Sequence, residues 1–105
     1  MADRFRPDYA SAFKRQYSKL SESNKKLADD EMRAVVELVN LDDPNSEAAK
    51  KTARELRIKV IQRFKRQRPR RMEATFSSDG RIVWALDKPL IRFIYIGNHS
   101  VLDKN

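Results

Sequence analysis

The stretch "MEATFSSDGRIVWALDKPLIRFIYIG", Met72 to Gly97, decides the fold of this 105-residue chain. Its apolar residues tend to recur at every second position, as in a strand whose successive side chains point to opposite faces of a sheet. Two runs of turn residues, "SSDG" (77–80) and "DKP" (87–89), interrupt the alternation. The stretch therefore predicts three short antiparallel strands, at about 72–76, 82–86 and 90–97, joined by tight turns.

The residues before this meander predict helices. Apolar side chains recur at i, i+4, i+8 and i+11 between Tyr9 and Leu20, which is one face of an α-helix. Pro7 suits the first turn of that helix, where the N–H that proline lacks would have no partner. Phe5 adds a possible short edge strand at the start of the chain.

A second helix follows, with Ser21 or Ser23 as its N-cap and apolar positions of period 3.6 from residue 27 to residue 39. The run "NLDDPN" (40–45) ends it. Helical spacing from residue 49 to residue 64 then predicts a long third helix, from about Ser46 to about Arg66. Leu56, Ile58 and Val60 also alternate as a strand would, so a strand is the competing interpretation there.

Helices followed by a meander predict an α+β fold, with N-terminal helices packed on one face of a small C-terminal antiparallel β-sheet. The length favours a single domain over residues 1–105. The chain has no cysteine, and its charged N-terminus lacks the apolar core of a signal peptide. We therefore expect a cytoplasmic protein with no membrane segment.

Positive charge is concentrated in one segment. The chain carries 23 Lys and Arg against 15 Asp and Glu, a formal net charge of +8, and residues 46–71 hold 11 of the basic residues but two acidic ones. Such an excess is typical of a surface that binds RNA phosphates or an acidic protein. The candidate RNA-binding residues are Arg57, Arg63, Lys65, Arg66, Arg68, Arg70 and Arg71, with Tyr95 as an aromatic ring that could stack on a base.

The C-terminal third resembles the RelE/ParE superfamily of bacterial toxins. The resemblance rests on a turn that ends in Gly-Arg, the strand start Arg81-Ile82-Val83-Trp84, and a last aliphatic strand that ends in "GNH" (97–99). It implies the RelE-like fold. In the RNA-cleaving branch it also implies a toxin that binds the ribosome, cuts messenger RNA without a metal and is neutralised by a cognate antitoxin.

Carried over to this chain, the resemblance makes Arg81 the residue that contacts the scissile phosphate and His99 the proton donor. Glu73 is the candidate general base, because it is the carboxylate on the strand before the turn. Gly80 and Gly97 could permit the turns or bulges that aim Arg81 and His99 into one cleft. No metal or other cofactor is expected.

These residue types suit metal-free RNA cleavage. The 2′-hydroxyl attacks phosphorus, so a base must take its proton and an acid must protonate the leaving 5′-oxygen, which histidine can do near neutral pH. Arginine stays charged and donates two parallel hydrogen bonds to a phosphate. Two alternatives stay open, because no aromatic residue follows His99. They are a ParE-like toxin that inhibits a protein such as DNA gyrase by binding, and a non-catalytic RNA- or ribosome-binding module.

Overall fold

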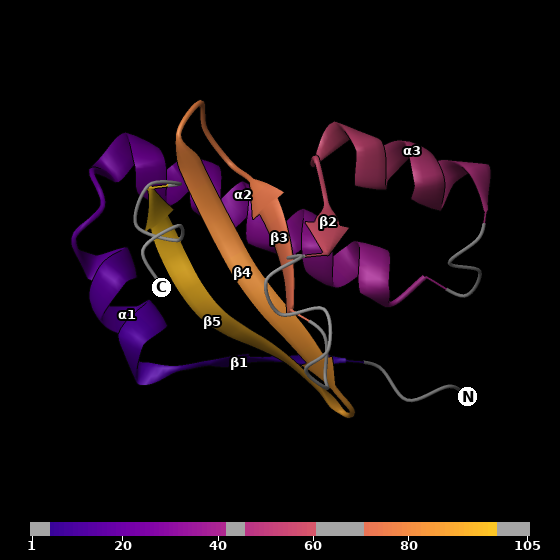
Figure 1. Cartoon of the computed structure of the whole chain (residues 1–105), viewed down its shortest axis with the longest axis horizontal. Helices are drawn as coiled ribbons and strands as arrows, with labels where there is room; N and C mark the ends of the chain where they lie inside the picture. The colour runs from indigo at the N-terminus through magenta and orange to yellow at the C-terminus, as the bar shows by residue number, and fades with distance from the viewer. Residues whose placement is uncertain (1–4, 42–45, 61–70, 99–105) are drawn as a thin grey trace.

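A computed structural model of the chain describes residues 5–41, 46–60 and 71–98. Figure 1 shows a curved sheet with helices α1 and α2 on one side of it. In order, the described elements are β1 (Arg6–Tyr9), α1 (Ser11–Ser18), α2 (Glu22–Val39), α3 (Glu47–Glu55), β2 (Lys59–Val60), β3 (Arg71–Thr75), β4 (Gly80–Asp87) and β5 (Leu90–Asn98). The predicted α+β fold is confirmed.

The five strands form one sheet in the order β1-β5-β4-β3-β2. Strands β3, β4 and β5 are the predicted antiparallel meander, and their turns fall at the two runs of turn residues. At the far edges, β1 pairs with β5 in parallel and β2 pairs with β3 in antiparallel orientation. The sheet is therefore mixed, since one of its pairings is parallel.

A register shift in β5 decides which aromatic residues enter the core. Val83 pairs with Tyr95, but Trp84 pairs with Phe93, so β5 contains one extra residue at this point. The shift places Phe93 on the face of Trp84 and Tyr95 on the opposite face. The strand spacing of Trp84, Phe93 and Tyr95 in the sequence predicts a core position for all three rings. That prediction is wrong for Tyr95, because the bulge reverses the alternation.

The hydrophobic core lies between the helices and one face of the sheet. Phe13 of α1 and Val35 of α2 are buried there against Trp84 and Phe93 of the sheet. The remaining buried members of the cluster are Ala28, Ala74, Phe76, Ile82, Ile91 and Ile96. Burying apolar surface stabilises the fold by roughly 25 cal/mol per Å². None of the described helices is long and apolar enough to cross a membrane.

The start of the chain forms a strand where a helical turn was predicted. Pro7 lies in β1, so the prediction that it begins the first helix is wrong, while the prediction of an edge strand near Phe5 is close to the observed β1. The N–H groups of Arg6 and Ala10 donate to carbonyls of Pro89 and Phe93, both at 2.9 Å. Pro7 falls between these donors, on the open edge of the strand, where a missing N–H leaves no bond unmade.

Helix α2 begins where the sequence predicted. Ser21 is its N-cap, and the Ser21 side chain accepts a hydrogen bond from the backbone N–H of Asn24 at 3.2 Å. At the other end, Asn40 follows the last turn, and its side-chain amide bonds both backbone groups of Phe5. These bonds tie the start of β1 to the end of α2.

The prediction of one long third helix is wrong within the described residues. Helix α3 ends at Glu55, and Arg57 adopts a left-handed backbone with φ of 55°. The N–H of Arg57 donates to Arg54 O and that of Ile58 to Ala53 O, both at 3.1 Å, which closes the helix as a Schellman motif. Strand β2 follows at Lys59–Val60, so the alternating interpretation is correct there, whereas Leu56 is the C-cap of α3. Residues 61–66 of the predicted helix lie outside the described residues.

Candidate functional site on the helix-free face of the sheet

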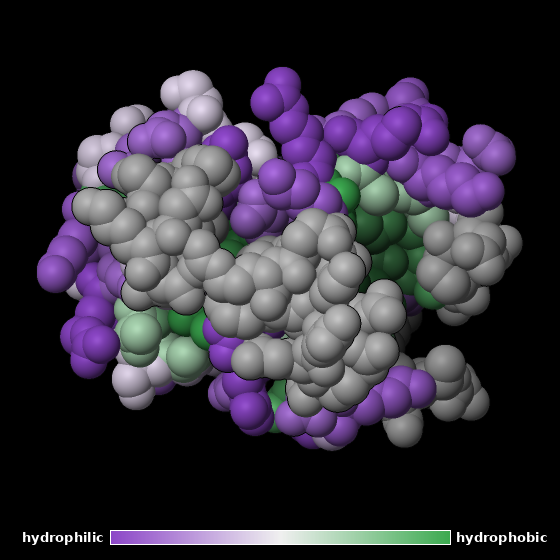
Figure 2. Space-filling view, viewed as in Figure 1, coloured by the Kyte–Doolittle hydropathy of each residue, from purple (hydrophilic) through white to green (hydrophobic). Residues whose placement is uncertain are grey.

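The sheet face opposite α1 and α2 gathers charged side chains, and we call it the helix-free face. Three cross-strand rows build it in register. Its described members are Lys59, Glu73, Val83 and Tyr95 in one row, Thr75, Arg81 and Gly97 in the next, and Arg71, Ala85 and Arg92 in the third. Figure 2, drawn from this side, shows hydrophilic residues along α3 and around much of the described rim.

A buried carboxylate stands at the centre of this face. The side chain of Glu73 is 7% exposed, and its Oε1 lies 3.4 Å from Lys59 Nζ and 3.8 Å from Arg81 Nε. A buried charge is strongly unfavourable unless it is paired, so both cations stabilise Glu73 in the fold. Glu73 is therefore a buried, paired carboxylate and differs from an ordinary exposed strand residue.

Arg81 is held from two sides. Its Nη1 donates to the carbonyl of Gly80 at 3.0 Å, and its Nε faces Glu73. The side chain is 17% exposed, so the guanidinium is fixed rather than extended into solvent. The structure thus brings together Arg81 and Glu73, two of the three predicted catalytic residues. Arg81 also pairs with Gly97, two residues before His99 in the sequence.

Several predicted residues fall outside the described part of the chain. They are His99 and the basic residues Arg63, Lys65, Arg66, Arg68 and Arg70. Their roles stay predictions.

Three of the predicted RNA-binding residues are described. Arg57 is exposed at the end of α3, just before β2. Arg71 begins β3 opposite Ala85, and Tyr95 is half-buried in the same row as Glu73. Arg71 and Tyr95 lie on the helix-free face with Arg81, so these parts of the predicted set share one surface.

The two glycines serve different purposes. A Cβ built on Gly80 would lie 2.5 Å from both Phe76 Cζ and Ser77 Oγ, so the tight turn before Arg81 requires a residue with no side chain. A Cβ on Gly97 would meet Tyr95 Cε1 at an ordinary 3.7 Å. The bulge in β5 also lies before Tyr95 and not at Gly97. A glycine is thus needed on steric grounds at position 80 and not at position 97, while the predicted aiming of His99 lies outside the described residues.

Sequence reasoning missed two basic residues of this face. Lys59 was placed inside a long helix, and only the strand interpretation of Leu56 to Val60 could have put it opposite Glu73. Arg92 was not singled out, and its Nε donates to Asp8 Oδ2 at 3.1 Å across the β1–β5 pair. Arg92 is thus neutralised by a carboxylate on its own side of the sheet, away from Glu73.

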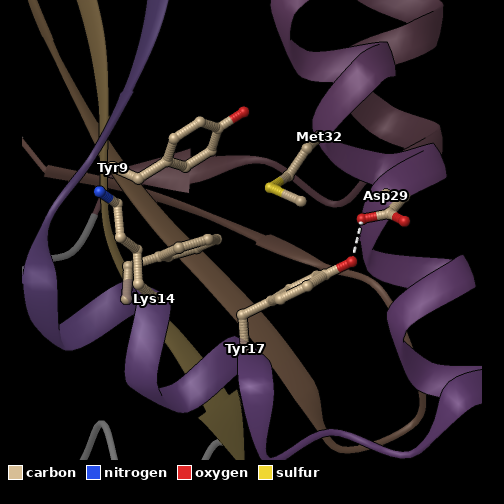
Figure 3. Close-up of a pocket in the computed structure, with 6 residues that line it drawn as sticks. Tyr9, Lys14, Tyr17, Asp29 and Met32 are labelled. Carbon is tan, nitrogen blue, oxygen red and sulfur yellow. Dashed lines mark hydrogen bonds between the residues drawn. The ribbon is translucent and has the colours of Figure 1, made fainter.

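A separate cavity of about 310 Å³ lies between β1, α1 and α2. Tyr9, Tyr17 and Met32 line it, and Figure 3 shows the Tyr17 hydroxyl donating to Asp29. That bond is 2.8 Å long, and it is the main reason why the pKa of Tyr17 is raised above its usual 10.0. None of the predicted site residues lines this cavity. Within residues 5–41, 46–60 and 71–98, no group of His, Cys, Asp and Glu is placed to hold a metal ion.

Comparison with known proteins yields structural relatives and no sequence relatives. No family model matches the sequence, and no curated protein matches it. The crystal structure of YafQ from E. coli strain BL21(DE3) matches with a TM-score of 0.60 at 14% identity, covering 94% of this chain and 98% of that one. The E. coli DinJ-YafQ toxin-antitoxin complex matches with a TM-score of 0.64 at 15% identity, covering 96% and 98%.

A copper-bound mutant toxin from Helicobacter pylori also matches, with a TM-score of 0.62 at 12% identity, covering 93% of this chain and 98% of that one. The chain has the RelE-like toxin fold. In this chain, the meander and the two N-terminal helices lie close to where the residue pattern predicted them, and β2 adds a short strand at the edge.

Proposed function

We propose that this protein is the toxin of a toxin–antitoxin pair and that it cleaves messenger RNA on the ribosome without a metal ion. The observation that carries the proposal is Arg81, fixed beside the buried Glu73 on a basic face of a RelE-like fold. Arg81 follows the turn at Gly80 and pairs with the end of β5, the strand that leads to His99. Phosphate binding by an arginine and proton transfer at the same bond are the two tasks that the proposed reaction needs.

In the proposed reaction, Arg81 donates hydrogen bonds to the non-bridging oxygens of the scissile phosphate. The charge that develops there as the 2′-oxygen attacks, with the 2′-hydroxyl proton passing to a solvent water, is thereby stabilised. His99 protonates the leaving 5′-oxygen, a role that suits imidazole near neutral pH. The reaction leaves a 2′,3′-cyclic phosphate and a 5′-hydroxyl end. Charge stabilisation by an arginine removes the need for a metal ion at the phosphate.

An antitoxin is the proposed protein partner. One of the matching structures is a complex of YafQ with DinJ, a toxin with its antitoxin. The surplus of basic residues in 46–71 favours a partner that carries acidic residues. An antitoxin that covers this segment would keep messenger RNA from Arg81.

Induction in bacterial cells tests the proposal. We expect wild type to produce new 5′-hydroxyl ends inside translated reading frames, and His99→Ala and Arg81→Ala to abolish them while both variants accumulate as folded protein. Arg92→Ala, on the same face but paired with Asp8, is the matched control and should cut as wild type does. Growth arrest with intact messenger RNA in wild-type cells would contradict cleavage. It would favour a toxin that inhibits a protein target by binding.

A further inference from the structure

Glu73 is paired with two cations that come from different strands. Lys59 comes from β2 and Arg81 from β4, on either side of Glu73 in β3. Their nitrogens lie 3.4 and 3.8 Å from the same oxygen, Oε1 of Glu73. Two cations that share one oxygen at these distances are close enough to contact a single phosphate group together. Neither is held by a short charge-assisted hydrogen bond, which is about 2.7–2.9 Å long.

The two cations differ in exposure in a way that suits a ligand from solvent. The side chain of Lys59 is 64% exposed, while that of Arg81 is 17% exposed. Oε1 of Glu73 is buried and accepts no hydrogen bond among the described residues. The carboxylate therefore acts on its neighbours by charge, and the ammonium of Lys59 keeps N–H donors for a second anion.

We infer that Lys59 and Arg81 form a two-cation site for an RNA phosphodiester, and that Glu73 is a positioning residue that holds this pair together and is not the general base. The inference rests on the proposed function and adds Lys59, a residue outside the predicted set. Arg81 contacts the scissile phosphate, and Lys59 contacts the same phosphate or the next one along the strand. Glu73 keeps both side chains on the helix-free face when no RNA is bound.

Removing the charge of Glu73 separates this role from the role of a base. Glu73→Gln takes a negative charge away from the site, so simple electrostatics predicts tighter binding of RNA. If Glu73 positions the two cations, binding becomes weaker in spite of the gain in positive charge. A general base would show a third pattern, in which binding is kept or improved and cleavage is lost.

The experiment measures binding of a 2′-O-methylated single-stranded RNA 12-mer, which cannot be cleaved because its 2′-oxygen cannot attack. The purified chain is titrated at several salt concentrations. We expect Lys59→Ala and Arg81→Ala each to weaken binding about 5–10-fold and to flatten the plot of log affinity against log salt by about 0.7, one phosphate contact each. Lys59→Arg should restore the slope, and Arg92→Ala should leave it unchanged. Glu73→Gln should weaken binding at least about 3-fold.

Each outcome points to one conclusion. An unchanged slope in Lys59→Ala overturns the two-cation site, and kept or tighter binding in Glu73→Gln overturns the positioning role. If Glu73→Gln fails to fold, the pair of variants at Lys59 still decides whether this cation contacts RNA. If wild type binds no RNA at all, the two-cation site for free RNA is overturned. The proposed function is then decided separately by the mapping of 5′ ends in induced cells, where the ribosome is present.

Discussion

The two faces of this sheet bury side chains for opposite reasons. On the helix side, Trp84 is 2% exposed among apolar neighbours, and on the helix-free side Glu73 is 5% exposed between two cations. A buried indole is stable in any close-packed apolar setting, since burial of its surface is itself favourable. A buried carboxylate is stable only while its partners stay in place. The helix-side face thus gives the fold its stability, while the helix-free face holds a few charged groups at fixed positions.

The largest effect should come from the core face. Trp84→Ala leaves a cavity under α1 and α2 and is expected to lower the free energy of unfolding by about 3–5 kcal/mol, measured by urea denaturation. Leu86→Ala, on the same strand but at a position that is 36% exposed, is the control and should cost much less. Equal losses in the two variants would show that the core does not lie between the helices and this face.

On the helix-free face, the expected loss is smaller and can be reversed. Arg81→Met removes one partner of Glu73 and should lower the free energy of unfolding by about 1–3 kcal/mol, because the carboxylate stays buried with one cation fewer. Adding Glu73→Leu to Arg81→Met should recover most of that loss. Thermal or urea unfolding of the single and double variants measures both steps. A double variant as unstable as the sum of two independent losses would show that the pair is not coupled in the fold.

Glu31 is a carboxylate that has no ion pair with any cation in the described ranges, which makes it a useful comparison with Glu73. It lies on the side of α2 that carries Ala28 and Val35, and its Oε2 is buried with no hydrogen-bond partner among the described residues. Burial raises the pKa of Glu31 from 4.5 to about 7. The folded protein therefore binds a proton that the unfolded chain has released, and stability falls as pH rises from about 4.5 through about 7.

Glu31→Gln removes this pH-dependent loss. At pH 8 we expect Glu31→Gln to stabilise the protein by on the order of 1–2 kcal/mol, a range lowered because the residue is only partly buried, and at pH 4 by much less. Unfolding curves at the two pH values measure the difference. Glu37→Gln, at an exposed position on the same helix, should show no such dependence. If the free energy of unfolding changes with pH in the same way in Glu31→Gln and wild type, the pKa of Glu31 is not raised in the fold.

The smallest effect is expected at Arg57, and it has the opposite sign. A left-handed backbone costs roughly 1 kcal/mol for a residue with a side chain, so Arg57→Gly should raise the free energy of unfolding by about that amount. Arg54→Gly, one turn earlier in the regular part of α3, should lower it by a similar amount. If Arg57 contacts RNA, the more stable Arg57→Gly variant should bind the 12-mer less tightly. Destabilisation by Arg57→Gly would show that the Schellman closure of α3 is not formed.

The sequence predicted the helix side of the sheet better than the helix-free side. Period-two alternation and turn residues located all three strands of the meander, because hydrophobic burial follows a repeating pattern. The bulge that turns Tyr95 to the other face leaves no local signal. The position of Lys59 beside Glu73 could not be predicted either. It depends on the pairing of β2 with β3, which joins residues 14 positions apart. Arg81 was found through a short family motif, Gly-Arg at the end of a turn. The glycine of that motif, Gly80, has no room for a side chain.

Cleavage of RNA on the helix-free face, with Arg81 on the scissile phosphate, can be measured in a translation extract. Purified wild type, Arg81→Ala and Arg92→Ala are each added to the extract while one messenger RNA is translated, and the 5′ ends are mapped. We expect cuts within the reading frame for wild type and Arg92→Ala, and a loss of at least about 100-fold for Arg81→Ala. Equal cutting by Arg81→Ala and Arg92→Ala, with both variants folded, would show that Arg81 takes no part in cleavage.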